Sequence, residues 1–211
     1  MNAPVPVPGA AADSESHTWE TALLRLLDDP YVFASTGPRQ HPGADWAEDV
    51  LAVLRRENAD PRGWAGLDWD RDGEERAAVG PSFPFRADLT AAGLRAGLYP
   101  VDRASATDLL ASFTQEWTFE VTPLYARTPA ELEAVREDAR TLLRRYEGAE
   151  AGDTGTTYWT TSPLARTTTT PDFLQARLAG GGTRCTDYVE ELGLIVLTPS
   201  EAAVFWSFNA L

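Results

Sequence analysis

The sequence contains no lysine, and all eighteen of its basic residues are arginine. This absence excludes a P-loop lysine under a nucleotide phosphate and a lysine that forms a Schiff base with pyridoxal phosphate. It also excludes a protein-kinase strand lysine and a Ser-Lys dyad. A coding sequence rich in G and C would produce this bias toward Arg, Ala, Gly and Pro. The chemical exclusions hold whatever its cause.

Cysteine and histidine are almost absent as well. The one cysteine, Cys185, cannot form an intrachain disulfide or the several-cysteine sites that bind zinc or iron–sulfur clusters. His17 lies at the end of an N-terminal tail, so a His–Cys or Ser–His–Asp centre would have to use His41. No G-x-S-x-G motif is present. We interpret His41 as a surface residue of a Pro-stiffened turn and Cys185 as a small half-buried residue on a strand.

Long apolar runs and a basic surface are also lacking. No apolar stretch approaches the length of a membrane span, and residues 1–16 lack the basic and apolar regions of a secretory signal. The net charge of −14 disfavours binding to nucleic acid or to an anionic membrane. We therefore expect a cytoplasmic protein, with no nucleic-acid or membrane partner, whose charge suits a basic protein partner.

What is present predicts a packed globular core, since 43% of residues are hydrophobic and 10% are aromatic. Helical periodicity and capping signals predict helices at about 18–29, 45–57, 88–98, 105–115, 128–147 and 170–179. The clearest has Thr128 as its cap, Pro129 in its first turn and Glu131 closing a capping box.

Alternation of apolar and polar residues predicts strands at 117–125, 158–160, 188–190 and 194–197. Shorter strands are expected at 31–33, 64–69 and 83–85, and Thr36–Gly43 is expected to be a loop. Thr198-Pro199-Ser200-Glu201 resembles a helix start, but the aromatic residues that follow favour a closing strand. These elements predict one α+β domain over residues 17–211, with a mixed or antiparallel sheet packed against four or five helices, after a disordered tail at residues 1–16.

The sharpest local motif is an acidic cluster with alternating carboxylates at Asp68, Asp70 and Asp72, followed by Gly73. Three carboxylates at this spacing can converge on one hard cation. The six residues 68–73 match the start of an EF-hand calcium loop. The match then stops, because Val79 stands where a bidentate glutamate belongs. Calcium remains the one cofactor that we consider, with Glu74 or Glu75 as a further ligand; the alternative is a solvated acidic turn. The Asp68-Trp69-Asp70 motif also occurs in metal-dependent glycosyl transfer, but the expected glycine-rich nucleotide-binding unit is missing upstream.

The chain has seven tryptophans. Trp117, Trp159 and Trp206 lie on expected strands, so we assign them to the core. Trp64 and Trp69 lie in polar, glycine-rich sequence beside the acidic cluster. Aromatic side chains often anchor interfaces, so we expect these two tryptophans on an exposed binding surface.

These observations favour a non-enzymatic protein-binding module. Its partner-binding residues would be the two tryptophans and five acids of the segment around 60–80, namely Trp64, Trp69, Asp68, Asp70, Asp72, Glu74 and Glu75. In composition the chain is similar to small acidic inhibitors, such as immunity proteins that neutralise a basic toxin nuclease. Two alternatives stay open: a hydrolase that holds a divalent metal at Asp68, Asp70 and Asp72, and a structural subunit of a larger assembly.

Overall fold

The structure, a computed structural model, describes residues 10–27, 32–40, 45–57, 82–114, 127–147, 155–174, 184–188 and 190–209. Within these residues the fold is α+β, as the sequence predicts, with a five-stranded antiparallel sheet in the order β1-β5-β4-β3-β2. The strands are β1 (Val32–Pro38), β2 (Tyr99–Val101), β3 (Thr157–Thr160), β4 (Glu190–Leu197) and β5 (Glu201–Asn209). The described α-helices are α1 (Ala10–Leu26), α2 (Trp46–Leu54), α4 (Ala91–Ala96), α5 (Arg103–Ser112) and α6 (Pro129–Arg144).

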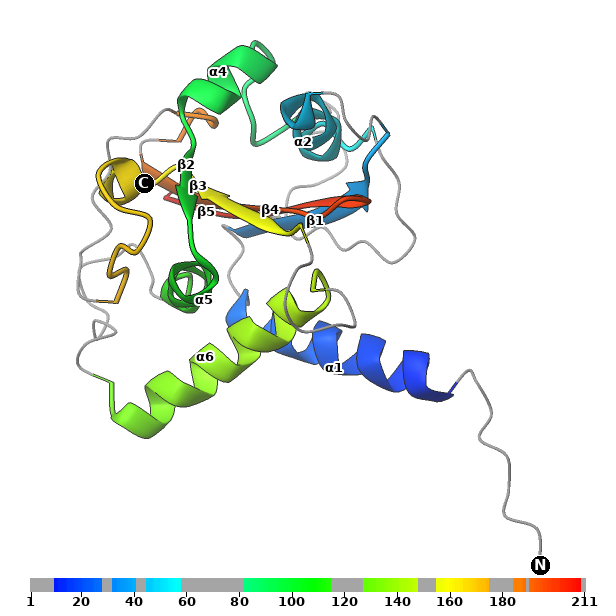
Figure 1. Ribbon diagram of the computed structural model, residues 1–211, viewed down its shortest axis with the longest axis vertical. Coiled ribbons are helices and arrows are strands. Elements are labelled where there is room, and N and C mark those ends of the chain that lie inside the picture. The colour runs from blue at the N-terminus through cyan, green and yellow to red at the C-terminus, as the bar shows by residue number, and fades with distance from the viewer. Residues whose placement is uncertain are drawn as a thin grey trace, which may run out of the picture.

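Helices cover both faces of the sheet. Figure 1 shows α2 and α4 on one side, and α1, α5 and α6 on the other. Successive strand residues alternate between the two faces, so Leu194 and Phe205 pack under α1, α5 and α6, whereas Ile195 and Trp206 pack under α2 and α4. With both faces buried, the central strands β4 and β5 carry apolar side chains on both faces over most of their length.

Side-chain caps define where the helices begin. The Thr128 hydroxyl accepts the Glu131 amide, and the Glu131 carboxylate accepts the Thr128 amide, which confirms the predicted capping box of α6. Asp45 caps α2 by accepting the Ala47 amide at 3.1 Å. These bonds satisfy amide groups that the first turn of a helix leaves without a partner.

The β4–β5 connection decides between the two interpretations of Thr198–Glu201. The Thr198 hydroxyl accepts the Ser200 and Glu201 amides, at 3.2 and 2.8 Å, and the Thr198 amide donates to the Glu201 carbonyl at 2.9 Å. The Thr198 hydroxyl thus bonds as the cap of a helix would, but these bonds close a tight turn between two strands. Residues 201–209 therefore form a strand, as their aromatic content predicts.

Several predicted boundaries are wrong. Helix α1 starts at Ala10 instead of near Thr18, so it takes in the alanine-rich second half of the segment predicted as a tail. Strand β1 runs through Thr36, Gly37 and Pro38, which were assigned to a loop, because they pair with Ala203, Ala202 and Glu201 of β5. Phe85 forms only an isolated bridge, to Thr186. The predicted strand at 117–125 lies outside the described residues, as do residues 1–9 of the tail.

Among the described helices, none is long and apolar enough to cross a membrane.

Candidate functional site

The acidic, Trp-bearing segment falls between the described residues 57 and 82. All seven predicted partner-binding residues, including the three predicted metal ligands, therefore lie outside the described residues: Trp64, Asp68, Trp69, Asp70, Asp72, Glu74 and Glu75. The same is true of His41. The structure describes the two borders of the segment, residues 55–57 and 82–85, and what surrounds those borders.

The first border is the end of α2, which is fixed by a two-bond cap. The Arg56 amide donates to the Val53 carbonyl at 3.0 Å, and the Glu57 amide donates to the Ala52 carbonyl at 2.8 Å. Arg56 has a φ of 59°, the left-handed conformation that this helix-ending motif requires. Glycine usually occupies this position, and a side chain there costs roughly 1–2 kcal/mol.

The second border is tied to the first by two arginine side chains. The Arg56 guanidinium donates to the Phe83 carbonyl at 3.2 Å, and the Arg55 guanidinium donates to the Leu89 carbonyl at 3.0 Å. Arg56 also lies over the Phe33 ring, 5.9 Å from its centre. The chain therefore leaves and re-enters the described structure at neighbouring points, on the side of the sheet that carries α2.

Aromatic rings continue from the second border across this face of the sheet. Phe83 meets the edge of Tyr188 at 6.4 Å, and Tyr188 stacks on Phe208 at 4.5 Å. Phe85 makes edge contacts with Phe33 and Trp206, at 5.0 and 5.3 Å. Phe83 and Tyr188 are only partly buried. They place apolar ring surface within reach of solvent beside the border of the acidic segment.

The three tryptophans that the sequence assigns to the core differ in burial. Trp206 is fully buried, as the core assignment expects. Trp159 is only half-buried and stacks on Trp46 of α2, with ring centres 5.0 Å apart. Trp117 lies outside the described residues.

A partly buried carboxylate, Glu191 of β4, bonds to residues 185–186 beside this region. It accepts the Cys185 amide at 2.5 Å, the Thr186 amide at 2.7 Å and the Thr186 hydroxyl. Burial raises the pKa of Glu191 above its ordinary value, and the hydrogen bonds from Cys185 and Thr186 oppose that shift. Glu191 thus fastens residues 185–186 to strand β4, and its oxygens are already occupied by donors of the chain itself.

Cys185 is fully buried, not half-buried as the sequence suggested. Burial also raises the pKa of its thiol, and the neighbouring Glu191 carboxylate adds to the shift. A thiol held protonated in this way is a poor nucleophile. Its surroundings are those of a packing residue.

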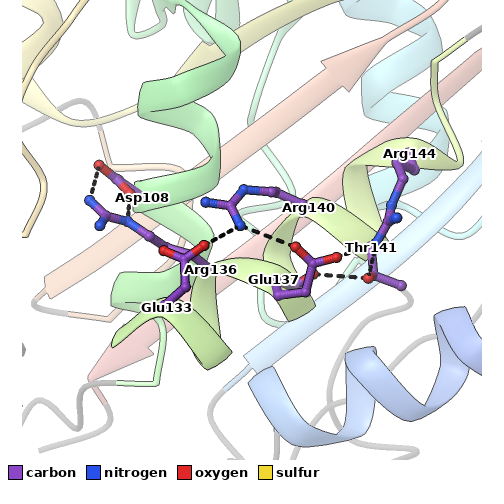
Figure 2. A network of polar contacts seen from close by, with 7 residues as sticks. All are labelled: Asp108, Glu133, Arg136, Glu137, Arg140, Thr141 and Arg144. Carbon is purple, nitrogen blue, oxygen red and sulfur yellow. Dashed lines mark hydrogen bonds and ion pairs between the residues drawn. The ribbon is translucent and has the colours of Figure 1, made fainter. Parts of the chain in front are cut away.

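Most arginines of the described part are engaged with the chain's own oxygens. Those in ion pairs with carboxylates are Arg25, Arg39, Arg86, Arg95, Arg103, Arg136, Arg140, Arg144 and Arg145. Figure 2 shows the densest group, along α6, where Arg140 bridges Glu133 and Glu137 and Arg136 reaches Asp108 of α5. The Glu137–Arg140 contact is local, since the two residues are three apart on the helix, whereas the Asp108–Arg136 contact joins two helices.

One arginine pair is buried and structural. Arg39 donates to Asp49 at 2.9 Å and to the Thr198 carbonyl at 3.0 Å, while Asp49 also accepts the Gln40 amide at 3.0 Å. The Asp49 side chain is fully buried. This cluster joins the end of β1, helix α2 and the β4–β5 turn, and its bonding capacity is spent within the fold.

Across the described ranges, no group of three or more His, Cys, Asp and Glu side chains is placed to hold a metal ion. The features that sequence reasoning missed are the Arg56 tie, the partly buried Phe83–Tyr188 pair and the Glu191 cluster. Each depends on contacts between distant segments, and only the Pro-rich, aromatic stretch at 81–85 hinted at them.

No family model matches the chain, and neither a curated protein nor a solved structure resembles it closely enough to count as a match.

Proposed function

We propose that the chain is a non-enzymatic protein-binding module that recognises a basic protein through the acidic, Trp-bearing segment at residues 60–80. The module would act as an immunity-type inhibitor, by covering the functional surface of its partner. The observation that carries this proposal is the imbalance of charge. Most described arginines are engaged with oxygens of the chain itself, and the chain as a whole has a net charge of −14.

The segment itself is acidic: residues 58–81 include six acidic and three basic side chains. Opposite potentials on two partners accelerate their encounter, and aromatic side chains supply much of the binding free energy once contact is made. Trp64 and Trp69 would act together with the half-exposed Phe83 and Tyr188 at the border. The Arg56–Phe83 bond supports this arrangement, because it holds the two ends of the segment near one another.

The first experiment is an affinity capture with the tagged chain at low salt, followed by identification of the bound protein. We expect one stoichiometric basic protein that salt releases. Its association rate should fall steeply between low salt and 0.5 M salt, since the Debye length shortens from about 30 Å at 0.01 M to about 3 Å at 1 M. An association rate indifferent to salt would contradict the electrostatic mechanism.

Two double variants, which lose the same number of negative charges, test whether the acidic segment is the binding surface. Asp70→Asn with Asp72→Asn removes two charges from the segment, whereas Glu20→Gln with Glu48→Gln removes two charges from exposed positions on α1 and α2. We expect the first pair to slow association by roughly tenfold, as steering by a local charge patch predicts, and the second to change it less than about twofold. Equal effects of the two pairs would show that net charge matters and that the segment does not.

A further inference from the structure

The exposed face of α6 carries a strip of four charged side chains, Glu133, Glu137, Arg140 and Arg144. Their spacing of four, three and four residues places them within an arc of about 60°, at 100° per residue. Their exposed fractions are 58%, 54%, 33% and 55%. Figure 2 shows this strip along one side of the helix.

The strip points away from the core. The opposite face of α6 buries Ala139, Leu142 and Leu143. Helix α1 is tied to this helix by a bond from the Trp19 indole to the Leu142 carbonyl at 3.1 Å, and α5 is tied to it by the Arg136–Asp108 ion pair. The packing needs of the helix are therefore met on its inner side, and the charged strip is left for solvent or for a second surface.

The order of charges in the strip is self-complementary. The two acids lie toward the N-terminal end and the two arginines toward the C-terminal end. The pattern is symmetric about the point between Asp138 and Ala139. A second copy of α6, laid antiparallel across a two-fold axis at that point, would set Glu133 opposite the partner's Arg144 and Glu137 opposite the partner's Arg140.

We propose that this strip is a contact surface between two copies of the chain, which associate through antiparallel α6 helices about a two-fold axis. A two-fold contact uses the same patch on both subunits, so that patch must be complementary to itself. The order of charges along α6 meets this requirement. Ala130, Ala134 and Thr141 border one side of the strip with short side chains, so on that side no bulky side chain obstructs a second helix.

Within one chain the same side chains already pair. Arg140 donates to Glu133 at 2.7 Å and to Glu137 at 3.1 Å, and Arg144 donates to Glu137 at 2.7 Å. Association exchanges these pairs for equivalent pairs between subunits, so few ion pairs are gained. The dimer is consequently weak and sensitive to salt.

The α6 strip shares no residue with the proposed partner-binding segment. Helix α6 covers one face of the sheet, and the described borders of the segment lie on the other face with α2 (Figure 1). The test below therefore uses the protein alone and gives its result whether or not a partner exists.

The experiment is sedimentation velocity over a range of protein concentration up to the millimolar range, at about 0.1 M salt. There the Debye length of about 10 Å screens the overall repulsion between acidic subunits but leaves contacts at 4 Å largely intact. We expect a reversible monomer–dimer equilibrium that shifts to monomer at 1 M salt. A chain that stays monomeric throughout overturns the proposal.

Complementary variants give the decisive result. An acidic-strip variant carries Arg140→Glu and Arg144→Glu, and a basic-strip variant carries Glu133→Arg and Glu137→Arg. We expect the self-association constant of each to fall at least tenfold, and a one-to-one mixture of the two to form heterodimers more tightly than the unmodified chain forms homodimers. A mixture that remains monomeric overturns the proposal.

Two controls keep this result interpretable. Arg86→Glu with Arg95→Glu makes the same change in net charge at exposed arginines away from α6, and it should leave dimerisation within about twofold of the unmodified chain, as expected for distant, independent sites. Circular dichroism reports whether each variant is folded. If a double reversal unfolds the chain, the single reversals Arg144→Glu and Glu133→Arg form a second complementary pair with the same expected outcome on mixing.

Discussion

At the scale of single residues, the packing of Trp206 against strand β4 depends on the absence of a side chain at Gly193. Gly193 of β4 lies opposite Trp206 of β5, and a Cβ built on Gly193 would lie 2.4 Å from the indole ring. The fully buried tryptophan has no room to move away. We predict that Gly193→Ala lowers the free energy of unfolding by about 3 kcal/mol, at the upper end of overpacking costs, as measured by urea denaturation.

Gly93 in α4 is the matched control. A Cβ there meets only the Thr90 hydroxyl, at 3.2 Å. Alanine in a helix interior is favoured over glycine by roughly 0.5–1 kcal/mol. Gly93→Ala should therefore leave stability unchanged or raise it slightly. Equal losses in the two variants would show that the Trp206 contact is not the cause.

Glu191 makes stability depend on pH. Because burial raises its pKa, the folded protein holds this proton more tightly than the unfolded chain, whose carboxyl titrates near 4.5. The resulting stabilisation is complete below that value and is lost as pH rises through the raised pKa of the folded state. We predict that the unmodified chain loses stability relative to Glu191→Gln as pH rises from about 4 to 7, in urea titrations at several pH values.

The comparison for this prediction is Glu190→Gln. The side chain of Glu190 lies on the opposite side of β4, since successive strand residues alternate. Removing the Glu190 carboxyl should not produce the same relative change with pH. If both variants behave alike, burial of Glu191 is not what sets the pH dependence.

At the scale of elements, the end of α2 holds a non-glycine residue in a left-handed conformation. Arg56 has a φ of 59°, and its side chain bonds to Phe83. We predict that Arg56→Gly is more stable than Arg56→Ala by about 1 kcal/mol, because both lose the side-chain bond and only alanine keeps the backbone cost. Thermal and urea unfolding of the two variants measure the difference. A more stable alanine variant would mean that this turn is not left-handed in solution.

The elements that the sequence predicted well are those whose signals are local. The α6 capping box lies within Thr128–Glu131, and the structure confirms it bond by bond. Thr198 carries the same local signal, but its hydroxyl closes a strand turn, because Phe205 and Trp206 that follow are buried between two layers of helices. The sequence predicts β1 too short for a related reason. Pairing with β5 outweighs the turn preference of Gly37 and Pro38, so the strand continues through them.

At the scale of the whole molecule, the helical and alternating patterns of the sequence predicted the fold class, but the surroundings of the candidate site could not be predicted. The Arg56–Phe83 tie and the Glu191 cluster join segments that only the folded sheet brings together. The acidic segment itself rests on sequence alone. Its two interpretations, as a protein-binding surface and as a metal site, predict different responses to divalent cations.

A metal titration separates these two interpretations. If Asp68, Asp70 and Asp72 bind a hard cation, a free cation concentration of one hundred times the Kd would add about 2.7 kcal/mol to the free energy of unfolding. As a protein-binding segment has no such requirement, we predict that thermal unfolding is the same in calcium, magnesium, manganese and chelator. A stabilisation that Asp70→Ala abolishes would contradict this and would support the metal-dependent hydrolase.

Helix α6 covers one face of the sheet, and the described borders of the acidic segment lie on the other face with α2 (Figure 1), so the two sets of residues share no described contact. Substitutions at distant sites that share no contacts usually act independently, within about 0.5 kcal/mol. We therefore predict that reversing Arg140 and Arg144 abolishes dimerisation but changes the affinity of each chain for its basic partner by about twofold or less. Isothermal titration of the captured partner against the variant and the unmodified chain measures this. A larger loss would mean that the partner contacts α6 or requires the dimer, and the two surfaces would then form one binding site.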